Sequence, residues 1–314
     1  MRSQRPILFG LVGDSASGKS TLATGITDIL GRDRVTVMCA DDYHRYDRGE
    51  RATRGVTPLD PDCNYLDVLE LHLDRLRSGL PVLKPVYDHS DGTLARPEYV
   101  RPREFVIVEG LLAFHTQQMR DCFHVKVYLD PPEDLRRVWK IKRDTTKRGY
   151  TEEQVLVEME RREKDSARFI RPQRSEADIV VRFYPAAGTP PEQANGRLNV
   201  RLVLRPTIPH PDFSNVFEYT GAGTCPAVRL ELGRDEGRPA DFLDIDGNVA
   251  PGEAGELEEM IWSHLPEARH LGSDAIGVYA DRAEVRHSDP LALTQLLISY
   301  HMLRAAQTAG AAWR

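Results

Sequence analysis

Short apolar runs alternate with stretches of helical periodicity over the first 185 residues. Apolar runs of strand length occupy residues 5–11, 35–40, 105–108, 125–129 and 179–183. Helices are predicted by apolar positions three or four residues apart over 22–30 and 66–76, by the Pro131–Pro132 pair, and by the capping box that opens 151–169. This alternation of strands and helices favours a parallel α/β sheet.

The pattern changes after residue 185. Pro- and Gly-rich turns separate strand-like runs at 198–204, 228–232 and 275–279, and helices are predicted near 253–264 and 290–306. The only linker-like stretch is 185–196. We therefore expect a core over residues 1–195 and a C-terminal α/β extension over 196–314 that packs on the same core.

The loop after the first predicted strand carries the strongest chemical signal. Residues 13–20 read GDSASGKS, a complete GxxxxGK[ST] motif between a strand and a helix. Glycines let backbone amides turn toward a phosphate, and the helix N-terminus adds positive potential. Lys19 is expected to reach the β/γ-phosphates and the Ser20 hydroxyl to bind Mg²⁺. We assign nucleotide contacts to Gly13, Ser15, Gly18, Lys19, Ser20 and Thr21.

Two carboxylates follow predicted strands at the edge where open α/β sheets place ligands. Asp41 ends the second strand and can take a proton from an attacking hydroxyl, whereas its neighbour Asp42 is more easily read as a cap. Glu109 ends the apolar run 105–108, where a carboxylate can hold Mg²⁺. No NKxD or LSGGQ string occurs, so a small-molecule kinase is favoured over a GTPase or a transporter ATPase.

Charge is unevenly distributed. Residues 134–174 contain 13 Lys/Arg against 8 Asp/Glu, whereas 211–260 contain 12 acidic residues against 3 basic ones. Within the basic stretch Lys140, Arg143, Asp144 and Lys147 share one predicted helix face, with Arg148 next. Such a stripe can close over ATP and neutralise transition-state charge, or can be a solvated helix with internal ion pairs.

Composition excludes several classes of protein. The 314 residues are 40% apolar and 29% charged, as in ordinary globular proteins. No apolar run approaches about 18 residues, so no membrane span is expected. The four cysteines lie far apart, which argues against a disulfide scaffold or a structural zinc site and favours a cytoplasmic location. A net charge of −6 gives no reason to expect a nucleic-acid partner.

Five strings taken together resemble the phosphoribulokinase/uridine kinase family, and the phosphoribulokinases of plants and cyanobacteria within it. They are GDSASGKST, CADDYHRYDRGER, KPVYDH, VIVEG and WKIKRDTTKRGY. The resemblance is nearly continuous over residues 7–184 and weaker beyond. It implies an α/β fold with a P-loop nucleoside-kinase-like sheet, flanking helices and a strand-rich C-terminal extension.

The resemblance also implies a reaction, transfer of the ATP γ-phosphoryl group to the 1-hydroxyl of ribulose 5-phosphate, and a homodimer. Asp41 matches the family's catalytic base and Glu109 its acidic Mg²⁺ residue. The positions that match substrate-binding residues are His44, Arg48, Tyr87 and His89. Those that match the lid are Lys140, Arg143, Asp144 and Arg148.

The residues also indicate independently why a phosphorylated sugar fits. Arginines at 45, 48, 51 and 54 supply more positive charge beside Asp41 than a neutral nucleoside needs, although the last two are equally compatible with a solvated loop. The alternatives are a uridine or other sugar kinase, and a catalytically silent nucleotide-binding regulator. The presence of Lys19, Asp41 and Glu109 argues against the regulator.

One departure from the plant enzymes concerns cysteine. Those enzymes pair a cysteine in the phosphate loop with one just before the DDYH motif; here Cys39 is present but Ser17 occupies the loop position. Cys225 lies near one member of their C-terminal pair and has no partner. We therefore expect an enzyme that is indifferent to dithiol reductants.

Overall fold

The computed structural model describes residues 5–194, 196–213, 227–271, 276–281 and 284–310. The chain forms two compact units that interleave along the sequence. The first comprises Met1–Lys19, Asp33–Tyr128 and Trp139–Ala177, and the second comprises Ser20–Arg32, Leu129–Val138 and Asp178–Arg314. The boundary expected at residue 195 stays a prediction.

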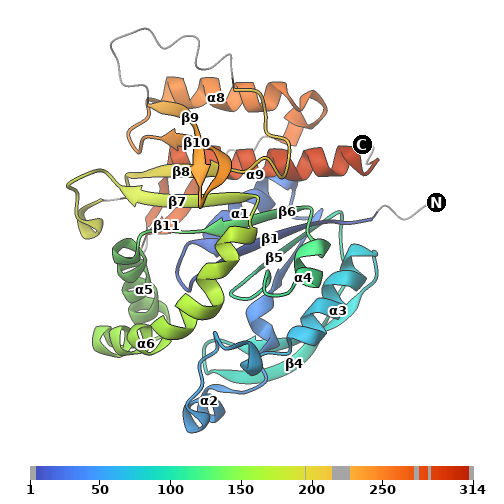
Figure 1. Cartoon of the computed structure of the whole chain (residues 1–314), viewed down its shortest axis with the longest axis vertical. Coiled ribbons are helices and arrows are strands. Elements are labelled where there is room, and N and C mark those ends of the chain that lie inside the picture. Colours follow the sequence, from blue (N-terminus) through green and yellow to red (C-terminus); the bar gives the residue numbers. More distant parts are fainter. Residues whose placement is uncertain (1–4, 195, 214–226, 272–275, 282–283, 311–314) are drawn as a thin grey trace. The chain divides into compact units, whose positions relative to one another are not determined.

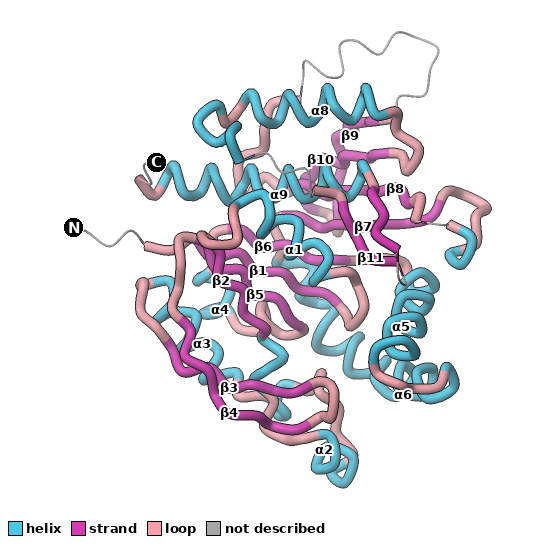
Figure 2. The backbone as a smooth tube through the Cα atoms, turned by 180° about the vertical axis from the view of Figure 1, so that it is seen from behind, coloured by secondary structure: helices cyan, strands magenta, loops and turns pink. Residues whose placement is uncertain are grey.

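The first unit contains the predicted parallel sheet. Its strands are β1 (Ile7–Gly13), β2 (Val35–Cys39), β5 (Phe105–Gly110) and β6 (Val125–Leu129), in the order β2-β5-β1-β6. Strands β1, β5 and β6 are labelled in Figure 1, and β2 is labelled in Figure 2. Every residue of β1 is buried, which explains its continuous apolar run. Gly10 is required there, because a Cβ would lie 2.3 Å from the ring of Phe114.

The register of this sheet brings three strand ends together. β5 pairs in parallel with both β1 and β2, so that Val12 lies opposite Gly110 and Cys39 lies opposite Glu109. The segments that follow β1 and β2 therefore emerge beside the end of β5. This edge is where open α/β sheets bind ligands.

Helices and a two-stranded ribbon complete the first unit. The helices are α2 (Arg48–Arg54), α3 (Leu66–Arg77), α4 (Gln117–Cys122), α5 (Glu133–Lys147), most of which lies here, and α6 (Glu152–Asp165). Short helical turns are η1 (Ala40–Tyr43), η2 (Pro61–Cys63), the π-helix η3 (Ser166–Ile170) and η4 (Arg171–Glu176). The ribbon pairs β3 (Val82–Asp88) with β4 (Thr93–Val100), and Figure 2 shows α2 near its end. Neither the ribbon nor α2 was expected from the sequence pattern.

The second unit is built on an antiparallel sheet. Its strands β7 (Ile179–Pro185), β8 (Leu198–Leu204), β10 (Arg238–Ile245) and β9 (Val228–Asp235) follow that order, and the pairings of β7 with β8, β8 with β10 and β10 with β9 are antiparallel. The other elements are α1 (Lys19–Leu30), η5 (Pro191–Gln193), α8 (Pro251–Ser263), η6 (Pro266–Leu271), β11 (Val278–Asp281), β12 (Glu284–His287) and α9 (Asp289–Thr308). The expected strand-rich extension is confirmed; the run predicted at 275–279 begins at a residue outside those described, and β11 starts at Val278.

Helix α9 is central to this second unit. It is buried along nearly its whole length, lies beside α8 and contacts β8 (Figure 1). The Gln295 side chain accepts a hydrogen bond from the Gly277 amide at 2.7 Å and donates one to the Thr21 carbonyl of α1 at 3.2 Å. No helix in the described ranges is long and apolar enough to cross a membrane.

Candidate active site

The phosphate loop joins β1 to α1 in the geometry that its motif predicts. Gly18 has φ +98°, a conformation that favours glycine. Lys19 Nζ donates to the carbonyls of Gly13 and Asp14 at 2.7 and 2.9 Å. Burial lowers the pKa of Lys19, against the opposing effect of the nearby carboxylates of Asp41 and Glu109. The lysine is therefore a desolvated cation held at the loop, and Ser20 and Thr21 follow it in α1.

Two neighbouring aspartates in η1 have different partners. Asp42 is buried, and its carboxylate accepts from Lys84 Nζ and from the Tyr87 amide, the latter at 3.1 Å. Asp41 accepts only the Leu111 amide, at 2.8 Å through Oδ1, among the interactions of the described residues. A Cβ on Gly110 would lie 3.0 Å from that oxygen, so glycine permits the approach. Asp42 is thus anchored to the ribbon, while Asp41 Oδ2 is left for other chemistry.

His44 is held in one tautomer by a chain of hydrogen bonds. Asn64 Nδ2 donates to the carbonyls of Pro58 and Asp60, which leaves Asn64 Oδ1 as an acceptor. This oxygen lies 2.7 Å from His44 Nδ1, so that nitrogen carries the proton and Nε2 presents a lone pair. Burial lowers the pKa of His44 to about 4, and the ring is neutral near pH 7. Its Nε2 is an acceptor suited to a sugar hydroxyl.

The other predicted substrate residues surround this histidine. The Tyr87 ring contacts the rings of His44 and His89 edge-on, with centroids 4.8 and 5.0 Å apart. The Arg48 guanidinium donates to the His89 carbonyl at 3.1 Å. Burial lowers the pKa of His89. The structure therefore brings together all four residues assigned to the substrate.

The arginine cluster is less uniform than its sequence spacing suggests. Arg51 is buried and donates to the Tyr46 carbonyl and to the Tyr87 hydroxyl, each at 2.5 Å. Arg45 donates to the Asn64 carbonyl at 2.9 Å, and Arg54 stacks on the Tyr46 ring. Arg51 is thus a structural residue that fixes Tyr87. Arg48 also contacts the ring cluster, through the His89 carbonyl, and its side chain is exposed.

The basic stripe of α5 centres on one carboxylate. Asp144 accepts from Lys140 and from Arg143 Nε at 2.8 Å, and Arg148 lies 3.5 Å away. Arg143 also donates to Ser15 Oγ of the phosphate loop at 3.1 Å. Burial, with the charge of Arg143, lowers the pKa of Lys140 to about 7. Lys140, Arg143 and Arg148 thus gather around one carboxylate, and the two arginines leave this face positive.

Several residues that shape the site had no local sequence signal. They are Asn64, which orients His44; Lys84, which binds Asp42; and Ser166, which donates to Asp14 of the phosphate loop at 2.6 Å. Each partner lies 20 or more residues away in sequence. Such pairings follow from the fold alone.

The oxygen donors available suit Mg²⁺. This ion prefers carboxylate, hydroxyl and phosphate oxygens. Glu109 stands half-buried at the end of β5, and the Ser20 hydroxyl follows the phosphate-loop lysine in the chain. Their donor chemistry fits a magnesium ion that accompanies ATP.

The cysteine positions agree with the sequence reading as far as the described residues reach. Cys39, Cys63 and Cys122 are free thiols. Ser17 is buried in the phosphate loop, and its hydroxyl has no hydrogen-bond partner among the residues described. Cys225 lies outside the described residues.

Comparison with known proteins agrees with this geometry. The model of the phosphoribulokinase/uridine kinase family matches residues 8–190. The chain is 33% identical over 300 residues to the phosphoribulokinase of Synechocystis, covering 91% of this chain and 87% of that one. It is 33% identical over 297 residues to the chloroplastic phosphoribulokinase of Arabidopsis thaliana, covering 84% of this chain and 73% of that one.

A third relative and a solved structure mark the limits of the similarity. The uridine kinase of Deinococcus deserti is 31% identical over 182 residues, covering 56% of this chain and 87% of that one. The phosphoribulokinase structure from Rhodobacter spheroides has a TM-score of 0.59 at 17% identity, covering 86% of this chain and 99% of that one, and so shares its fold. With the phosphate loop, the Asp41 turn and the basic helix in place, the chain belongs to the phosphoribulokinase/uridine kinase family.

Proposed function

We propose that this protein transfers the γ-phosphoryl group of ATP to the 1-hydroxyl of D-ribulose 5-phosphate, giving ribulose 1,5-bisphosphate and ADP. The observation that carries the proposal is the placement of Asp41, with one unengaged carboxylate oxygen, close enough to Lys19 to affect its pKa. Similarity to phosphoribulokinases over 91% of the chain supports this substrate, whereas similarity to the uridine kinase covers 56%.

The proposed chemistry assigns one task to each group. Asp41 accepts the proton of the 1-hydroxyl as its oxygen attacks the γ-phosphorus and the bond to the bridging oxygen of ADP breaks. Lys19 balances charge on the β- and γ-phosphates, and Lys140, Arg143 and Arg148 add positive charge from α5, with Asp144 ordering them.

Substrate binding and the metal complete the proposal. His44 Nε2 accepts a hydrogen bond from a sugar hydroxyl, and Tyr87 and His89 enclose the sugar beside it. Arg48 provides a planar cation for the phosphate monoester. When bound, Mg²⁺ supplies positive charge to the phosphate oxygens, and Ser20 and Glu109 are the residues that would hold it.

An ADP-release assay with separate substrates tests the reaction. We expect turnover with ribulose 5-phosphate and none with uridine. Asp41→Asn should lower kcat by roughly 10²–10⁴, the usual contribution of a general base. Asp62→Asn, an exposed carboxylate change in η2, is the matched control and should leave the rate unchanged. Turnover with uridine, or an unchanged rate in Asp41→Asn, contradicts the proposal.

We further propose a cytoplasmic homodimer, the state implied by the family resemblance. A mass near 71 kDa, about twice the 35.5 kDa of one chain, is expected in light scattering. A monomeric mass at micromolar concentration contradicts it.

A further inference from the structure

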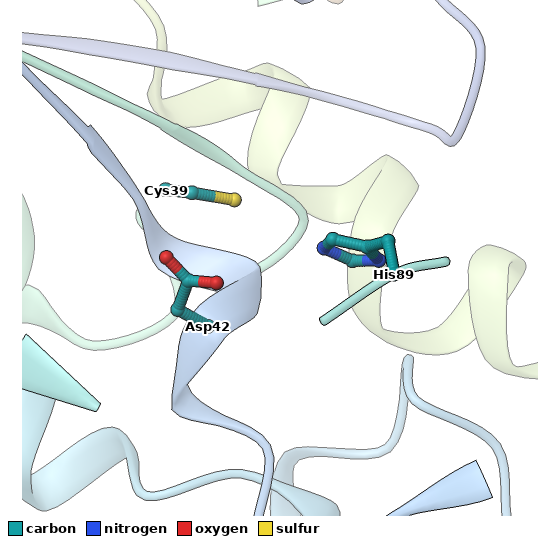
Figure 3. A group of neighbouring side chains, drawn as sticks. All are labelled: Cys39, Asp42 and His89. Atoms are coloured by element: carbon teal, nitrogen blue, oxygen red, sulfur yellow. The ribbon is translucent and has the colours of Figure 1, made fainter. Parts of the chain in front are cut away.

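Three side chains of different chemistry, those of Cys39, Asp42 and His89, lie close to one another, as Figure 3 shows. Cys39 ends β2, Asp42 lies in η1 and His89 follows β3. One ligand atom from each, the Cys39 sulfur, an Asp42 oxygen and a His89 nitrogen, lies within 4.8 Å of the other two. We propose that these three residues bind a borderline-soft divalent cation, represented by Zn²⁺, at a site separate from that of Mg²⁺.

The donor set selects the metal. Thiolate, imidazole and carboxylate together are ligands of zinc, whereas Mg²⁺ takes oxygen ligands in a rigid octahedron. Three protein donors leave a fourth tetrahedral position open for water or a substrate oxygen. Glu109 and Ser20 offer only oxygen ligands, so Mg²⁺ should bind there and Zn²⁺ at Cys39, Asp42 and His89.

The geometry requires only a small adjustment. Donor atoms around a tetrahedral zinc lie roughly 3.3–3.6 Å apart, so the cluster must contract by about 1 Å from its widest separation. His89 is half-buried in the turn that follows β3, and neither of its ring nitrogens has a hydrogen bond among the described residues. Rotation of this imidazole supplies the contraction.

The other two ligands are already oriented. The Asp41 backbone amide hydrogen-bonds the Cys39 sulfur. Asp42 accepts from Lys84 and from the Tyr87 amide, and a carboxylate has about four lone-pair positions, so acceptor capacity remains. Lys84 also pairs with Glu98 at 3.0 Å and stays compensated if Asp42 turns toward a metal. When the metal binds, the Cys39 thiol loses its proton to solvent, and the oxidation state of the metal does not change.

A metal at this site would affect catalysis. Cys39 is two residues from Asp41, and His89 belongs to the proposed sugar site. An occupied site therefore removes His89 from the sugar and places a dication beside the base. We expect Zn²⁺ to inhibit the kinase competitively with the sugar phosphate. This inhibition rests on the proposed function, whereas the binding of the metal does not depend on it.

Direct binding is measured by titrating the metal-free protein with Co²⁺, whose thiolate complexes absorb in the near ultraviolet. We expect one thiolate-bound Co²⁺ per chain, displaced by Zn²⁺ and retained in excess Mg²⁺. The sulfur-to-cobalt band should vanish in Cys39→Ser and weaken in His89→Ala. It should persist in Cys63→Ser and Cys225→Ser, which remove other thiols. A band that survives Cys39→Ser, or the absence of a band in the unaltered protein, overturns the proposal; thermal melting confirms that each variant is folded.

Inhibition is measured separately. Cys39→Ser should retain turnover and require at least tenfold more Zn²⁺ for half-inhibition than Cys63→Ser does. Equal sensitivity of the two variants would contradict inhibition through this site. If ribulose 5-phosphate is not phosphorylated at all, the proposed function fails, yet the cobalt titration still decides whether the site binds metal.

Discussion

The buried lysine of α5 provides the most direct test of how this site handles charge. The pKa of Lys140 is lowered to about 7, so near pH 8 only about one molecule in ten carries the ammonium before nucleotide binds. If Lys140 faces the ATP phosphates as proposed, binding restores its proton. Raising the pH from 6 to 8 then costs about 1.4 kcal/mol of binding free energy. The apparent affinity for ATP should fall about tenfold from pH 6 to pH 8.

Calorimetry with a non-hydrolysable ATP analogue at pH 6, 7 and 8 measures this dependence, and buffers of different ionisation enthalpy report the proton taken up. The γ-phosphate titrates in the same range, so the comparison is with Lys140→Arg, whose guanidinium stays charged. This variant should retain only the pH dependence of the nucleotide. His44 adds nothing, because with a pKa of about 4 it is neutral throughout.

Two outcomes would refute the reasoning. One is an identical pH dependence in the unaltered protein and in Lys140→Arg. The other is proton uptake on binding that is no greater in the unaltered protein than in Lys140→Arg at pH 8, because a lysine that gains anionic neighbours must take up protons.

Three further predictions concern stability, tautomer and redox state. Asn64→Leu leaves the His44 Nδ1 proton and the Pro58 carbonyl without their hydrogen-bond partner, whereas the Asp60 carbonyl keeps the Cys63 amide. The free energy of unfolding in urea should fall by about 1–3 kcal/mol. The KM for sugar phosphate should rise about three- to tenfold as one hydrogen bond is lost, and an unchanged KM would show that His44 does not bind the sugar. Gly10→Ala places a Cβ against the Phe114 ring and should lower the free energy of unfolding by about 1–3 kcal/mol. Gly255→Ala, which has open space around it in α8, should raise the free energy of unfolding by about 0.5–1 kcal/mol. Melting temperatures equal to that of the unaltered protein would contradict both predictions. Dithiothreitol should leave the rate of the zinc-free enzyme with Mg-ATP unchanged, because the phosphate loop carries no cysteine. Severalfold activation would contradict this.

Local patterns predict the parts of the fold whose own residues are buried in regular order. Strands β1, β5 and β6 appear as apolar runs because nearly all their residues are buried. Strand β2 is also an apolar run, although its Val37 is exposed. Strand β4 leaves no such trace, because all its residues before Val100 are exposed. Helix α2 buries only Arg51, so it lacks apolar periodicity; its signal was instead the capping box of Asp47 and Glu50 with Gly55 at the C-terminal end.

The same distinction applies to the site. Lys19, Asp41 and Glu109 could be located from the sequence because each follows a strand and therefore lies at the carboxyl edge of the sheet. Asn64 and Lys84 could not, because their importance comes from partners brought close by the fold. The sequence also could not show that Arg51 is buried and hydrogen-bonded to Tyr46 and Tyr87, whereas Arg48 contacts His89 and is exposed.

The attachment of Asp42 to Lys84 has an evolutionary consequence. Lys84 also pairs with Glu98, so the more harmful single loss is that of Lys84, which would leave the buried Asp42 carboxylate without its cation; losing Asp42 and Lys84 together would leave no buried charge uncompensated. Positions 42 and 84 should therefore change in concert among related kinases, for example to a pair of small apolar residues. Position 41 is bound by no such partnership. The proposed role of Asp41 as the base should keep aspartate at position 41, whereas the residue at position 42 should change together with the residue at position 84.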